Sequence, residues 1–146
     1  MKYPYRRYAV LRSDGGTEVR TIYRPLVPVR IVGSSGTVEV LGLLDTGADT
    51  TILPWFLVQE RGISVASDNR WRLRGVGNQV VSVSSGRVEL QMGRGRSSLH
   101  WSAEVGFIQE RTVAVLGHAG FLEHFRVVFD GLRHEVTLQP NTSLPR

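Results

Sequence analysis

The stretch LLDTGADTTILP, Leu43 to Pro54, carries most of the information on how this chain folds. Its carboxylate Asp45 directly follows an apolar run, and a second carboxylate, Asp49, comes before the chain turns apolar again at Ile52. Burying a lone charge is expensive. The simplest interpretation is a turn at a strand end, because an Asp side chain bonds the backbone two residues on and glycine accepts a positive φ. The apolar residues on both sides predict more, namely a carboxylate held in a tight loop between two buried strands.

Alternating apolar and polar residues dominate the chain around this loop, as in LVPVRIV (26–32), TVEVLGLL (37–44), QVVSVSSGRVELQM (79–92), RVVFD (126–130) and HEVTLQ (134–139). This period of two predicts β-strands, and the glycine-rich segments between them are typical of hairpin turns. One segment differs, because Phe121, Leu122 and Phe125 have helical spacing. We therefore expect an all-β domain with one short C-terminal helix of about two turns.

Length and composition indicate a single soluble globular domain, with 146 residues of which 41% are hydrophobic and 21% charged. No apolar run approaches the roughly 18–20 residues of a membrane span, and the N-terminus lacks the apolar region of a secretory signal. We therefore expect a cytoplasmic protein without membrane partners. The chain has no cysteine, which removes disulfides and thiolate metal sites.

The net charge of +5 and the isoelectric point near 10.4 raise the question of nucleic-acid binding. The arginines are scattered singly or in pairs, so a solvated basic surface is the favoured interpretation and no nucleic-acid partner is expected. The four histidines, His100, His118, His124 and His134, lack the i, i+4 spacing of a helical zinc site. We expect no metal and no other cofactor.

The loop LLDTGADTTILP resembles the active-site loop of the retropepsin-like aspartic proteases, the family of the retroviral protease. RPLVPVRI (24–31) resembles the strand before that loop, RGVGNQ (74–79) lies where the glycine-rich flap tip is expected, and VAVLGHAGFLEHFRVVFD (113–130) resembles the strand, glycine and short helix that close the domain. The resemblance implies a closed, barrel-like acid protease domain at residues 21–140. Residues 1–20 are then an N-terminal extension, either an extra strand or a pro-segment, and residues 141–146 are a tail.

Peptide hydrolysis in this family implies two carboxylates that share one proton and activate one water. This chain has one suitable motif, because SDGG at Ser13 lacks an apolar approach and VFDGL around Asp130 is typical of a hairpin turn. The missing carboxylate must come from another chain, which predicts a homodimer with Asp45 of each protomer at the two-fold axis. The resemblance thus implies a homodimeric aspartic endopeptidase that acts on extended polypeptides.

The same resemblance assigns roles to individual residues of the loop. Asp45, Thr46 and Gly47 form the catalytic motif, in which Thr46 hydrogen-bonds across the dyad to the partner's loop. Ala48 and Asp49 contact the backbone of the extended substrate. An ordinary turn is the alternative for each of these polar side chains.

Two further segments complete the implied substrate site. Gly75, Val76 and Gly77 form the tip of a flap that folds over the peptide. Val113 and Val115 wall the side-chain pockets, with packing into the strand core as an equal alternative.

The sequence departs from the family pattern at two positions. Asn78 stands where the family often shows a glycine, and His118 stands where retroviral members carry an arginine that pairs with the acid corresponding to Asp49. A histidine could form that pair only when protonated. These departures keep open a second interpretation, a non-catalytic peptide-binding or dimerisation module that retains the fold.

Overall fold

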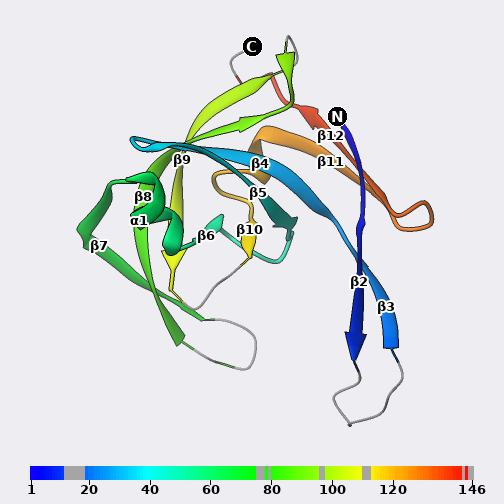
Figure 1. The fold of residues 1–146 in the computed structure, drawn as a ribbon, viewed down its shortest axis with the longest axis horizontal. Helices are drawn as coiled ribbons and strands as arrows, with labels where there is room; N and C mark the ends of the chain where they lie inside the picture. Colours follow the sequence, from blue (N-terminus) through cyan, green and yellow to red (C-terminus); the bar gives the residue numbers. More distant parts are fainter. Residues whose placement is uncertain are drawn as a thin grey trace.

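The structure is a computed structural model of the chain, and it describes residues 1–11, 19–74, 78, 80–95, 98–109, 113–142 and 144. The fold is mostly β with one short α-helix (Figure 1). The elements in chain order are β1 (Lys2–Pro4), β2 (Arg6–Leu11), β3 (Val19–Arg24), β4 (Leu26–Gly33), β5 (Gly36–Leu44), β6 (Ile52–Pro54), α1 (Phe56–Arg61), β7 (Val65–Arg74), β8 (Val80–Met92), β9 (Leu99–Ile108), β10 (Ala114–Leu116), β11 (Phe125–Asp130) and β12 (Glu135–Pro140). The predicted all-β class is therefore correct.

A seven-stranded sheet forms the body of the domain, in the order β4-β5-β10-β6-β9-β8-β7. β4 also pairs with β8, so the sheet curls back on itself around its apolar face. β10 lies between β5 and β6, parallel to the first and antiparallel to the second. The loop that joins β5 to β6 therefore has to pass the end of β10, which places residues from two distant parts of the chain beside each other.

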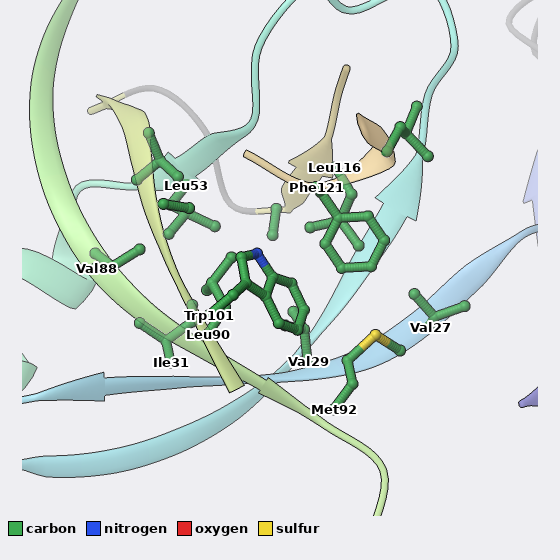
Figure 2. Close-up of a cluster of buried hydrophobic side chains, with 14 of the residues drawn as sticks. Val27, Val29, Ile31, Leu53, Val88, Leu90, Met92, Trp101, Leu116 and Phe121 are labelled. Atoms are coloured by element: carbon green, nitrogen blue, oxygen red, sulfur yellow. The ribbon is translucent and has the colours of Figure 1, made fainter. Parts of the chain in front are cut away.

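The main core fills the space inside this curled sheet (Figure 2). The alternation along β4 turns Val27, Val29 and Ile31 inward, and all three are at most 1% exposed. Figure 2 shows the indole of Trp101 in the middle of the cluster, and its Nε1 donates a hydrogen bond to Gly120 O at 3.0 Å. Burial of each such aliphatic chain contributes about 1.5–3 kcal/mol, so this alternation is a main source of stability.

The helix lies at a different position from the one that the sequence predicts. The α-helix is α1, which buries Leu57 and ends where Gly62 adopts the left-handed conformation at φ 61. In the expected segment, the structure has only a 3-10 turn at Leu122–His124. Phe125 is already extended and starts β11, so the helical spacing of the apolar residues serves packing around Trp101 rather than a helix.

A smaller three-stranded sheet has the order β1-β12-β11. β2 and β3, which both precede the large sheet in the chain, form a separate two-stranded ribbon that extends away from both sheets, at the lower right of Figure 1. The Tyr23 ring of the ribbon stacks on the His134 ring with 3.9 Å between centroids and 8° between planes. Tyr5 N also donates to His134 O at 2.7 Å, so the base of the ribbon is held by the β11–β12 turn.

Candidate active site

The Asp45 loop begins where two strands of the large sheet end together. Leu44 is the last residue of β5 and pairs with Leu116, the last residue of β10. Asp45 N donates to Leu116 O at 3.2 Å, and Leu44 N donates to Pro25 O at 3.0 Å. The backbone on both sides of the strand end is therefore hydrogen-bonded just where the carboxylate leaves the sheet.

The carboxylate itself is held by its own turn. Gly47 N donates to Asp45 Oδ1 at 2.9 Å, and Ala48 N donates to Asp45 O at 3.2 Å. Asp45 is half-buried, whereas Thr46, Gly47 and Asp49 are exposed. This is the Asp turn expected from the sequence. It orients Oδ1 of the carboxylate toward the Gly47 N–H, and the second oxygen takes no part in this hydrogen bond.

Residues 117–119 brace the loop from the other side. His118 N donates to Ala48 O and Ala119 N to Asp49 O, each at 2.9 Å. The two segments are so close that a Cβ on Gly117 would lie 2.3 Å from Thr50 O and 2.7 Å from Ala48 O. Only glycine fits at position 117 without displacing the loop backbone.

Thr51 is a supporting residue that sequence reasoning missed. Its side chain is fully buried, and its Oγ1 accepts a hydrogen bond from Gly117 N at 3.2 Å, across 66 residues of sequence. Thr51 N donates to Ala119 O at 2.9 Å, so Thr51 also holds the C-terminal end of the loop against residues 117–119. Alternation gave no signal for it, because Thr51, Ile52 and Leu53 are all buried.

His118 is the residue that departs from the retroviral pattern. It contacts the loop through an interaction that the sequence did not predict. Its Nε2 lies 3.0 Å from Thr46 O. A carbonyl oxygen can only accept, so the ring nitrogen donates in this contact, which the neutral ring with its proton on Nε2 can also provide. Among the residues that the structure describes, His118 forms no ion pair with Asp49.

An apolar floor adjoins the loop. Ile52, Val83, Ile108 and Val115 form a second buried cluster, against which Ala48 of the loop packs. Of the two predicted pocket residues, Val115 is buried at 3% exposure and Val113 is open to solvent at 41%.

The hairpin of β7 and β8 packs over this floor. Trp71, Leu73 and Val81 are its half-buried side chains in contact with the second cluster, and Trp71 Nε1 donates to Ser85 Oγ at 2.8 Å. The predicted flap-tip residues Gly75, Val76 and Gly77 lie outside the described residues. Asn78 is described and has φ 64, a conformation that glycine prefers and asparagine tolerates better than most residues. Asparagine is therefore a compatible replacement for the glycine of the family pattern.

The described segments contain neither a metal-binding cluster nor a membrane-spanning helix. There, no cluster of three or more His, Asp or Glu side chains is arranged to hold a metal ion. No helix in that part of the chain is long and apolar enough to cross a membrane.

Comparison with known proteins adds an independent result. The model of the retroviral aspartyl protease family matches residues 21–101. Among solved structures, the EIAV protease in complex with the inhibitor HBY-793 is 26% identical over 65% of this chain and 82% of that one, with a TM-score of 0.46. The retroviral protease-like domain of Ddi1 from Leishmania major is 19% identical over 83% of this chain and 98% of that one, with a TM-score of 0.49. No curated protein matches the chain. Because the family match covers more than half of the sequence and includes the whole Asp45 loop, the chain belongs to the retroviral aspartyl protease family.

Proposed function

We propose that the chain is a homodimeric aspartic endopeptidase, with residues 21–140 as its catalytic domain and Asp45 of each protomer forming the catalytic pair. The observation that carries this proposal is the half-buried Asp45 carboxylate in a loop whose backbone is fixed at both ends. A structural turn would need no such bracing. A carboxylate that must meet its symmetry mate within a few tenths of an ångström does need it.

The chemistry follows from placing two carboxylates side by side. Like charges about 3 Å apart cannot both ionise, so the pair holds one shared proton. The ionised Asp45 takes a proton from a water molecule, which attacks the peptide carbonyl carbon, while the protonated Asp45 of the partner subunit polarises the carbonyl oxygen. When the C–N bond breaks, the proton passes to the leaving nitrogen, and the pair returns to its starting state.

Neighbouring residues support this arrangement. Thr46 and Gly47 are exposed at the front of the loop, where a partner's loop would meet them. Ala48 and Asp49 lie on the substrate side, where an extended peptide would gain backbone hydrogen bonds as an added strand. The exposed Val113 and the apolar floor, of which Val115 is part, favour aliphatic side chains near the cleaved bond. Gly75, Val76 and Gly77 at the β7–β8 tip would cover the peptide and exclude water.

The test is cleavage of an unfolded polypeptide such as casein by the wild type and by Asp45→Asn. We expect the variant to lose cleavage while it stays folded. Glu60→Gln is the matched control, because it makes the same change of charge on the exposed face of α1, and it should cleave like the wild type. Activity in Asp45→Asn equal to that of the control would refute the proposal.

Dimerisation is tested by a concentration series with sedimentation analysis of the same samples. Below the dimer dissociation constant, cleavage by a shared site rises with the square of the protein concentration. Strict linearity from a sedimenting monomer would contradict the shared dyad. A dimer that binds peptides and never cleaves them would instead establish the non-catalytic binding module.

A further inference from the structure

The β2–β3 ribbon contacts the rest of the described domain mainly at its base, where Tyr23 stacks on His134. In the described part of the chain the two strands pair only with each other, so both outer edges of the ribbon keep unpaired backbone groups. Tyr8, Val10 and Tyr23 remain 38%, 40% and 43% exposed. A two-stranded ribbon alone is marginally stable in water, and open edges readily accept a further strand. A surface of this kind is suited to binding an extended polypeptide.

The ribbon is also strongly basic. Its strands contain Arg6, Arg7, Arg20 and Arg24 and no acidic residue. Arg6 lies directly opposite Arg24, and Arg20 lies opposite Val10 on the same face. Like charges opposite each other destabilise a strand pair, and none of these arginines forms an ion pair with a described residue. The face that carries Arg6, Arg20 and Arg24 therefore has no anionic partner among the described residues.

The base of the ribbon adjoins the candidate active site. β3 passes into β4 through Pro25, whose carbonyl accepts the hydrogen bond from Leu44 N, the residue before Asp45. The stacking of Tyr23 on His134 fixes the direction in which the ribbon leaves the domain. Six residues of strand extend about 20 Å. A polypeptide held at Asp45 could thus continue along the ribbon.

We propose that the ribbon binds an acidic, extended segment of the polypeptide substrate, outside the part that contacts the Asp45 loop. The segment adds to an open edge of the ribbon by backbone hydrogen bonds, and its carboxylates pair with Arg6 and Arg20. This inference rests on the proposed function, because the ligand is a substrate only if the chain is a protease. The two ribbons of the proposed homodimer would bind acidic residues at either end of the cleaved segment.

The test measures binding without cleavage, on the full chain carrying Asp45→Asn. The probes are two labelled peptides that share one apolar octamer and carry either four glutamates or four glutamines at the N-terminal end, followed by fluorescence anisotropy. We expect the glutamate peptide to bind more tightly than the glutamine peptide. The ratio of the two affinities should fall about three- to tenfold in Arg6→Gln/Arg20→Gln and at high salt. Arg24 is left unchanged because it lies over the Tyr8 ring, 5.4 Å from its centroid.

The control is Arg94→Gln/Arg126→Gln, which removes the same charge from exposed positions outside the ribbon and should keep the advantage. Equal binding of the two peptides, or an equal loss in the control, would overturn the inference. It would also be overturned if Arg6→Gln/Arg20→Gln abolished the dimer in sedimentation, or if a single-stranded oligonucleotide bound the ribbon more tightly than the glutamate peptide.

The wild type is assayed for cleavage of the same peptides in parallel. Absence of cleavage together with ribbon-dependent binding would reject the proposed function and leave the ribbon as a binding surface for acidic polypeptides. Cleavage that is equally fast for both peptides, with no difference in binding, would reject the ribbon inference and leave the protease.

Discussion

Replacing Gly117 with alanine should damage the Asp45 loop selectively. The added Cβ would lie 2.3 Å from Thr50 O, where an ordinary contact needs at least 3.4 Å. The obstructing atoms belong to the backbone, so the loop has to move by about 1 Å instead of rotating a side chain away. Overpacking of this kind costs about 1–3 kcal/mol, which lowers the unfolding midpoint by about 2–12 °C for a chain near this length. Because a shift of about 1 Å at reacting groups can cost about 100-fold in rate, proteolysis should fall by about that factor.

The assay is thermal unfolding followed by circular dichroism, together with casein cleavage. Gly131→Ala is the matched control, because a Cβ there meets nothing within 4 Å and the backbone is outside the left-handed region. Its unfolding midpoint should stay the same or rise slightly. If Gly117→Ala unfolded at the same temperature as Gly131→Ala, the close approach of the two segments would be wrong.

Three further outcomes follow from the described contacts. Thr51→Val should lower the free energy of unfolding by about 1–3 kcal/mol because Gly117 N loses its buried acceptor, whereas Thr51→Ser should retain most of the stability. Urea unfolding of both variants measures this difference, and equal losses of stability would contradict the prediction. Leu53→Ala, at a fully buried position, should cost about 2–5 kcal/mol in the same measurement, and a loss below about 1 kcal/mol would contradict its place in the core. Burial, and secondarily the charge of Glu39, raises the pKa of Tyr3 above its ordinary value, so the unfolded chain releases this proton first as the pH rises. Stability should therefore decline above about pH 10, and Tyr3→Phe should make this decline shallower; parallel declines in the two proteins would refute the assignment.

The strand pattern was predictable because period two follows directly from the pleat of a strand that is buried on one face. Val27, Val29 and Ile31 show this, since each lies inward as its alternation requires. The family resemblance is likewise confirmed, because the motif around Asp45 is long and specific.

The two helical elements were not predictable in the same way. Helix α1 is only six residues long and buries a single side chain, Leu57, so it produces hardly any periodic signal. The spacing of Phe121 and Phe125 does produce such a signal, yet both rings pack around Trp101 from a 3-10 turn and a strand. Tertiary packing outweighs local periodicity in such short segments.

The supports of the candidate site depend on long-range contacts that no local pattern contains. Thr51 receives its hydrogen bond from Gly117, and His118 reaches Thr46 O, across 66 and 72 residues of sequence respectively. Sequence reasoning located the loop and the glycine-containing segment separately. Only the position of β10 between β5 and β6 reveals that one braces the other.

The threading of β10 between β5 and β6 also sets an order of events during biosynthesis. The ribosome completes the Asp45 loop long before it reaches the segment that fixes its backbone, because Asp45 N bonds to Leu116 O and Thr51 N to Ala119 O. Contacts that span much of the chain form late in folding. A nascent chain that still lacks β10 thus carries the carboxylate without the geometry it needs. The proposed protease would thus gain the means to cut polypeptides only after its own chain is largely folded and protected from cleavage.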